Sequence, residues 1–133
     1  NQMESSGEAG EKKDKIVLAT VKGDIHDIGK NIVRVLLENY GYTVLDLGRD
    51  VPCQLVADTA KEHGVKLVGL SALMTTTLGA MEETIQLVKQ SCPDCKIVVG
   101  GAVLTADYAE KIGADFYAKD AMETVAVAKE VVG

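Results

Sequence analysis

The chain has 133 residues, 47% of them hydrophobic and 26% charged, which is the length and balance of one globular domain. Its 14 Lys and Arg against 20 Asp and Glu give a net charge of −6, and the basic residues are scattered, so binding to a nucleic acid backbone is disfavoured. The sequence contains neither an apolar run of roughly 18 residues nor a secretory signal at its start. We therefore expect a cytoplasmic protein without membrane contact.

Residues 1–15 are polar and show no periodic apolar face, so we expect a flexible linker there and a folded domain over residues 16–133. A linker at this position suggests that the chain is the C-terminal piece of a longer protein.

Short β-branched runs alternate with segments of helical period from Ile16 onward. The runs predict five strands, at residues 16–21, 43–47, 67–72, 96–99 and 115–118. Each predicted strand is followed by a predicted helix: from Ile28 to Tyr40, from Pro52 to Gly64, around residues 81–88, over 106–112, and over 121–132.

The predicted strands are continuously apolar and lack the alternation of a sheet with one wet face, which indicates a parallel sheet covered by helices on both faces. We predict a doubly wound α/β fold of the flavodoxin-like (Rossmann-like) order with five strands. Ligands of such folds bind beyond the carboxyl ends of the strands, so the loops after the first, third and fourth strands are the candidate site.

The loop after the first strand contains Asp24-x-His26-x-x-Gly29. A carboxylate two residues before a histidine can accept one ring N–H, fix the tautomer and make the other nitrogen a better metal ligand. Gly29 would let a bulky ligand approach the backbone. For an isolated Asp-x-His, a histidine that merely caps a helix is the commoner interpretation.

Two further loops at the same edge favour a ligand-binding site over helix capping. The third strand leads into four hydroxyls, Ser71, Thr75, Thr76 and Thr77, which is more than helix capping and turn chemistry require. The fourth strand ends in Gly100 and Gly101, small residues that leave room for a large ligand.

These segments together resemble the corrinoid-binding domain shared by cobalamin-dependent methionine synthase, the methylamine and methanol corrinoid proteins, and the cobalamin mutases. The family pattern is Asp-x-His-x-x-Gly, then Ser-x-Leu, then Gly-Gly, and the resemblance runs from about Ile16 to the C-terminus. Here the pattern is supplied by Asp24, His26, Gly29, Ser71, Leu73, Gly100 and Gly101.

The resemblance implies that His26 is the lower axial ligand of cobalt, with Asp24 and the hydroxyl of Thr77 behind it. The nucleotide tail would enter a slot lined by Ser71, Leu73, Gly100 and Gly101. It also implies contacts to the cofactor from Gly23, Ile25, Asp27, Ile28, Gly29 and Thr75.

The implied function is that of a methyl carrier without catalytic residues of its own. It would hold cobalamin or a related corrinoid in the base-off, histidine-on form, as methylcobalamin during turnover. Its partners would be a substrate-specific methyltransferase, a methyl-accepting methyltransferase and a reductive activator, and a helical cap upstream would cover the corrin. The alternative is the cobalamin domain of a mutase or of a cobalamin-sensing regulator, which would need a large partner barrel or an effector domain. The sequence leaves the methyl donor open.

Other candidate motifs are weaker. Cys92-x-x-Cys95 follows a helix instead of preceding one and lacks a second ligand pair, so we expect free thiols. His63 fits the C-terminal turn of a helix. Lys119 follows the fifth strand as in phosphoacceptor receiver domains, but Ser71 stands where those domains carry an aspartate. The first loop also lacks the Gly-x-Gly-x-x-Gly of dinucleotide-binding folds.

Overall fold

The computed structural model of the protein describes residues 15–25, 28–101 and 104–132. The described chain forms one sheet of parallel strands in the order β3-β2-β4-β5-β6, the flavodoxin-like order, which confirms the predicted fold class. The strands are β2 (Lys15–Thr20), β3 (Thr43–Asp46), β4 (Leu67–Ser71), β5 (Lys96–Gly100) and β6 (Phe116–Tyr117).

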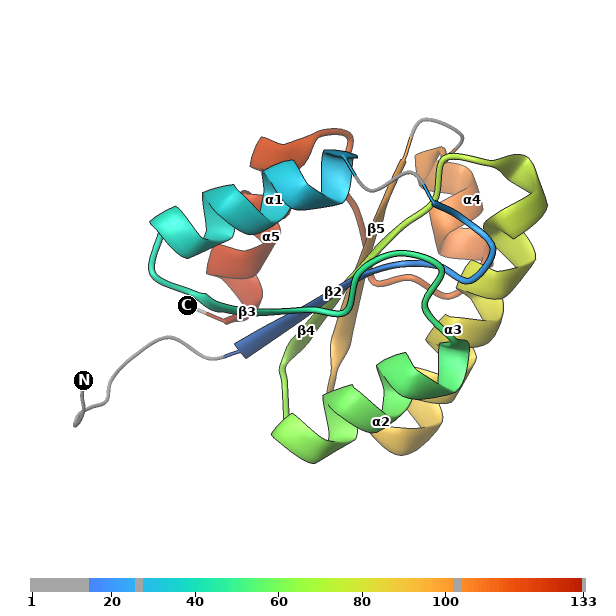
Figure 1. Ribbon diagram of the computed structural model, residues 1–133, viewed down its shortest axis with the longest axis horizontal. Helices are drawn as coiled ribbons and strands as arrows, with labels where there is room; N and C mark the ends of the chain where they lie inside the picture. Colours follow the sequence, from blue (N-terminus) through green and yellow to red (C-terminus); the bar gives the residue numbers. More distant parts are fainter. Residues whose placement is uncertain (1–14, 26–27, 102–103, 133) are drawn as a thin grey trace.

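Helices cover both faces of this sheet, as Figure 1 shows. Helices α1 and α5 pack on one face, whereas α2, α3 and α4 pack on the other. Their bounds are α1 (Ile28–Asn39), α2 (Cys53–His63), α3 (Leu78–Ser91), α4 (Ala106–Lys111) and α5 (Ala121–Val131), and a 3-10 turn, η1 (Thr75–Thr77), precedes α3.

The predicted boundaries hold to within a few residues. Lys15, which we assigned to the linker, is the first residue of β2 because its backbone pairs with Thr43. Gly64 takes the left-handed conformation that ends α2, with φ of 60°. The helix marked by Met81 begins earlier than its apolar pattern, at Leu78, directly after the 3-10 turn.

The core has two halves because successive strand residues point to opposite faces of the sheet. Val17, Val68 and Ile97 face α2 and α3, and Ile16, Leu67 and Val98 face α1 and α5. All six are almost completely buried, each stabilising the fold by roughly 1.5–3 kcal/mol through loss of apolar surface to water.

Helix α1 buries less of its apolar surface than its sequence pattern suggests. Leu37 is fully buried, but Ile28 is 75% exposed and Ile32 is 51% exposed. The apolar arc of this helix is wider than the strip that α5 and the sheet cover, so periodicity identified the helix without delimiting its buried face.

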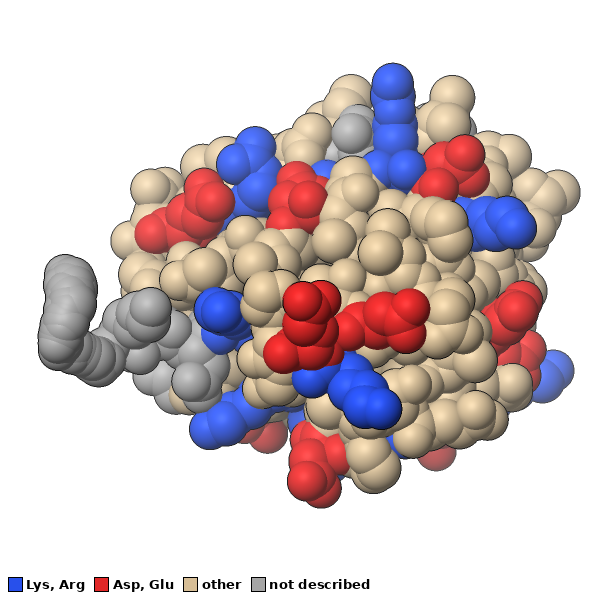
Figure 2. Space-filling model, turned by 60° about the horizontal axis from the view of Figure 1, so that its bottom comes forward, with Lys and Arg blue, Asp and Glu red and all other residues tan. Residues whose placement is uncertain are grey.

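Charged side chains of both signs are interspersed on the face of the molecule seen in Figure 2, without a broad patch of one sign. Among the helices of the described residues, none is both long and apolar enough to cross a bilayer.

Candidate functional site

The carboxyl ends of the three central strands lie in register. Thr20 of β2 pairs with Ser71 of β4, and Ser71 pairs with Gly100 of β5. Since the strands are parallel, the chain leaves the sheet at one edge after each of these three residues (Figure 1). Leu73 donates its N–H to Asp24, and Ala72 donates its N–H to Gly100, so the described residues that follow the strands are in contact. The three sequence segments singled out above are therefore neighbours in space.

Asp24 is the buried polar centre of this edge, with no exposed surface. Its Oδ2 accepts hydrogen bonds from the backbone N–H groups of Leu73, at 2.7 Å, and Met74, at 3.2 Å. The hydroxyl of Thr77 lies 3.0 Å from the same oxygen. A carboxylate buried without such donors would be strongly destabilising, so the loop after β4 both satisfies Asp24 and fixes its orientation.

Thr77 has a second acceptor within reach. Its Oγ1 lies 2.8 Å from the backbone oxygen of Met74 in addition to the Asp24 carboxylate. A hydroxyl has one proton to donate, so Thr77 shares it between the two acceptors. The structure thus brings together Asp24 and Thr77, which lie 53 residues apart in sequence.

The candidate ligand His26 and its neighbour Asp27 lie outside the described residues. The residues on either side frame the loop. Gly23 has φ of 89°, which favours glycine, and Ile25 is 60% exposed. On the other side α1 begins at Ile28, with Gly29 in its first turn.

A cavity of about 460 Å³ opens beside this loop, on the side of the sheet covered by α1 and α5. Five of the predicted contact residues line it: Gly29, Ser71, Leu73, Gly100 and Gly101. Four others do not: Gly23, Ile25, Ile28 and Thr75. The four residues of the predicted tail slot thus line one cavity together with Gly29, and the four residues outside it lie in the loop after β2, in the first turn of α1 and in η1.

Glycines create the space. Gly69 lies in the middle of β4 and lines the cavity beside Leu18, whose side chain would lie 2.5 Å from a Cβ at that position. A Cβ on Gly29 would meet nothing within 4 Å. Gly101 is constrained differently, because its φ is 143° and a Cβ there would lie 1.8 Å from the backbone oxygen of Ala72.

The far wall of the cavity was not foreseen as part of the site. It comes from the segment after β6 and the start of α5, and includes Tyr117, Lys119, Asp120 and Thr124. The resemblance motifs do not reach this segment. Among the cavity residues that the sequence analysis did not predict, Gly69 has a usable sequence feature, since an isolated glycine inside a strand indicates a close approach to the backbone.

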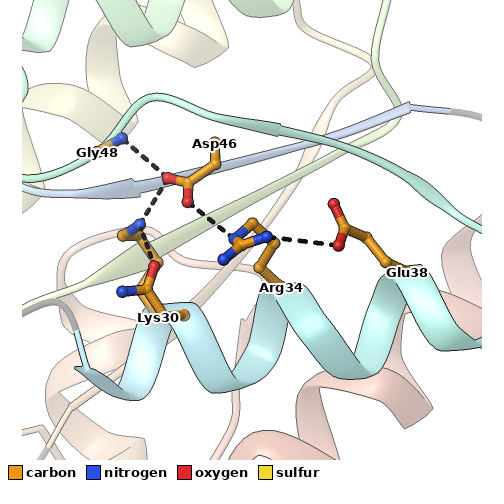
Figure 3. A network of polar contacts seen from close by, with 6 residues as sticks. Lys30, Arg34, Glu38, Asp46 and Gly48 are labelled. Carbon is orange, nitrogen blue, oxygen red and sulfur yellow. Dashed lines mark hydrogen bonds and ion pairs between the residues drawn. The ribbon is translucent and has the colours of Figure 1, made fainter.

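A polar network joins α1 to the end of β3 (Figure 3). Lys30, 4% exposed and in the cavity lining, donates to Asp46 Oδ1 at 2.5 Å. Arg34 reaches the other oxygen of Asp46 at 3.2 Å and Glu38 at 3.4 Å. Asp46 Oδ1 also accepts the backbone N–H of Gly48 at 2.9 Å. Asp46 thus compensates a buried cation and fixes the start of the segment that follows β3.

The cysteines are free, as predicted. Burial, and secondarily the neighbouring Cys92, raise the pKa of the Cys95 thiol to about 12, so this group stays protonated at neutral pH. No cluster of three or more His, Cys, Asp or Glu side chains suited to a metal ion occurs in the described part of the chain.

Comparison with known proteins matches residues 14–126 to the B12 binding domain family. The chain is 48% identical over 128 residues to dimethylamine corrinoid protein 1 of Methanosarcina acetivorans, covering 95% of this chain and 60% of that protein. The structure superposes on a cobalamin-binding protein of Desulfitobacterium hafniense with a TM-score of 0.87, at 41% identity, over 92% of this chain and 60% of the other.

A further match is the methanol:cobalamin methyltransferase complex MtaBC of Methanosarcina barkeri, with a TM-score of 0.88 and 32% identity. It covers 95% of this chain and 49% of the matched chain. The chain thus spans roughly half to three fifths of the length of these three relatives.

Proposed function

The chain belongs to the B12-binding domain family, and from this premise we propose that it holds a corrinoid and carries a methyl group on cobalt between two methyltransferases. The proposal rests on the relative position of a buried carboxylate and a cavity. The buried Asp24 carboxylate, two residues before His26, lies at the same sheet edge as a glycine-lined cavity of about 460 Å³.

The cavity fits the nucleotide tail of a corrinoid in size and chemistry. Its volume falls within the roughly 300–1,000 Å³ of small-molecule pockets. Its lining combines apolar side chains such as Leu18 and Val98 with the Ser71 hydroxyl, as an aromatic base on a sugar would require. Lys119 supplies the lining with a cation that suits the single negative charge of the tail phosphate, whereas Lys30 is already paired with Asp46.

His26 would then be the lower axial ligand, in the base-off, histidine-on arrangement. Asp24 supports this role because its orientation is already fixed by three donors on Oδ2, so that little rearrangement is needed to accept a ring N–H. A His26 imidazole not bound to the metal would take up a proton, and the carboxylate of Asp24, two residues before it in sequence, would stabilise the resulting charge.

The bound corrinoid supplies a cobalt atom that accepts a methyl group from one partner and passes it to the next. The chain's own part is to bind the tail, orient the imidazole and hold the proton at His26. We assign no catalytic residue to the chain, and the partners would be a substrate-specific methyltransferase, a methyl-accepting methyltransferase and a reductive activator. Similarity to a dimethylamine corrinoid protein makes a methylated amine the donor class to test first.

The proposal is tested by mixing the purified chain with hydroxocobalamin, removing the excess on a desalting column and recording the visible spectrum. Wild type, His26→Ala and His63→Ala are compared. His63 is the other histidine of the chain and is exposed on α2, so it is the matched control.

We expect wild type and His63→Ala to retain the same spectrum and His26→Ala to lose the histidine-dependent shift. An unchanged spectrum in His26→Ala would refute histidine ligation, and no retained colour in wild type would refute corrinoid binding. The carrier role is tested separately with a radiolabelled methylated amine and a dimethylamine methyltransferase, after a chemical reductant has brought the bound cobalt to its lowest oxidation state, by following label on the desalted, corrinoid-loaded chain.

A further inference from the structure

The segment after β3, residues 47–51, which we call the strap, lies against the end of β2. Leu47 donates its N–H to the backbone oxygen of Leu18 at 2.9 Å, and Thr20 donates to Gly48 at 2.9 Å. Val51 returns a bond to the oxygen of Thr20 at 3.1 Å. The strap therefore continues the parallel pairing of β2 and β3 beyond the sheet and follows the chain toward the loop that carries His26.

Asp50 is the residue of the strap that contacts this loop. Its backbone N–H donates to the oxygen of Asp24 at 2.9 Å. Its carboxylate Oδ1 accepts the N–H of Gly23 at 2.8 Å. One exposed residue thus holds main-chain groups of two consecutive residues of the loop, through its own main chain and its side chain together.

The backbone of Asp50 is unusual. With φ of 52° it is the sole non-glycine residue at positive φ in the described ranges. This left-handed conformation is disfavoured for residues with a Cβ, and Asp and Asn tolerate it best because their short polar side chains bond locally. Glycine at position 50 would adopt it freely but would lose the carboxylate bond to Gly23.

Asp24 is consequently held on two sides. The loop after β4 and the Thr77 hydroxyl hold its carboxylate, and Asp50 holds its backbone oxygen. The network of Figure 3 anchors the strap in turn, because Asp46, which pairs with Lys30, also accepts the N–H of Gly48. A continuous set of contacts leads from α1 through the strap to the residue two positions before His26.

We propose that Asp50 is a positioning residue that sets the loop carrying the axial histidine, so that ligation of cobalt by His26 depends on it. The inference rests on the proposed function above. Asp50 positions the loop through hydrogen bonds to Gly23 and Asp24, and its negative charge does not contribute to this effect. Losing its side chain loosens the loop and makes the protein imidazole easier to displace.

The test uses the full chain loaded with hydroxocobalamin and titrated with free imidazole, following replacement of the protein ligand in the visible spectrum. The variants are Asp50→Asn, Asp50→Gly and Asp50→Ala. Asp94→Asn is the control, because it removes one exposed carboxylate far from the site in sequence. Thermal unfolding of each apoprotein is recorded alongside.

We expect Asp50→Asn, which keeps an acceptor oxygen, and Asp94→Asn to match wild type within about twofold. In Asp50→Gly, free imidazole should displace the protein ligand at a concentration about fivefold lower than in wild type, which is the effect of one hydrogen bond. In Asp50→Ala the displacing imidazole concentration should be lower still, because this variant keeps the backbone strain and loses the hydrogen bond to Gly23. In the apoprotein, amide exchange at Gly23 should accelerate in Asp50→Gly, a readout that needs no cofactor.

Equal imidazole affinity in wild type, Asp50→Gly and Asp50→Ala would overturn the assignment. So would a loss in Asp50→Asn as large as in Asp50→Ala, because charge and not hydrogen bonding would then be responsible. If Asp50→Ala does not fold, Asp50→Gly decides, since glycine is unstrained at this φ. These outcomes differ from failure of the proposed function, in which wild type itself shows no spectrum that depends on His26.

Discussion

Gly101→Ala is expected to destabilise the protein strongly, for a reason that concerns the backbone more than the cavity it lines. With φ of 143°, Gly101 occupies a region that is accessible almost only to glycine. An added Cβ would lie 1.8 Å from the backbone oxygen of Ala72 and 2.8 Å from its carbonyl carbon. Ala72 is fully buried and donates its own N–H to Gly100, so it cannot move aside.

The size of the effect follows from these contacts. The backbone conformation alone costs a residue with a Cβ roughly 1–3 kcal/mol, and relief of the clash adds to it, so we expect a loss of at least about 3 kcal/mol. That is a large part of the roughly 5–15 kcal/mol that stabilises a domain. With a urea dependence of roughly 2 kcal/mol per molar, the unfolding midpoint of the apoprotein should fall by about 1.5 M.

Gly29→Ala is the matched control, because a Cβ on Gly29 meets nothing within 4 Å. In α1 this change should leave the apoprotein at least as stable as wild type, since alanine favours helix more than glycine does. Its methyl group extends into the cavity, so corrinoid affinity should fall while stability does not. A loss below about 1 kcal/mol in Gly101→Ala would refute the reasoning.

Three further outcomes follow from the same contacts. Thr77→Val should lower the free energy of unfolding by about 1–2 kcal/mol through loss of the bond to Asp24, whereas Thr77→Ser should not; equal urea midpoints for the two would contradict this. Thr20 is fully buried and its hydroxyl has no partner in the described structure, so Thr20→Val should raise the free energy of unfolding by up to about 1 kcal/mol, and a lower urea midpoint would be contrary evidence. The folded pKa of Cys95 is raised from 9.0 to about 12, so its contribution is constant below pH 9 and is lost as the unfolded thiol ionises between pH 9 and 12. Midpoints measured across this range should fall more in wild type than in Cys95→Ala, and parallel curves would show that another group is responsible.

The fold could be predicted because its strands are short, apolar on both faces and separated by helical periodicity, a pattern that leaves few topologies. Element limits were less accurate where a local event fixes them. The pairing of Lys15 with Thr43 and the 3-10 turn before Leu78 leave no mark in a hydrophobic pattern. Periodicity also overstated the buried face of α1, because it cannot tell how much surface a neighbouring helix will cover.

Part of the candidate site could also be predicted from the sequence, and part could not. Asp24, Thr77 and Ser71 lie at or just beyond the carboxyl ends of strands, where the fold class itself indicates a ligand site. The cavity wall at the start of α5, with Asp120 and Thr124, depends on how that helix packs and has no motif of its own. Asp50 was missed because a residue at positive φ is visible only in the folded backbone.

The central claim, that a protein histidine ligates the cobalt of a bound corrinoid, is tested most directly by electron paramagnetic resonance of the loaded, singly reduced chain. The chain is produced with ¹⁵N-labelled histidine, and the corrinoid is left unlabelled. We predict that the nitrogen splitting of the cobalt lines changes from the triplet of ¹⁴N to the doublet of ¹⁵N. A triplet that persists in the labelled protein, or the absence of any nitrogen splitting, would contradict it.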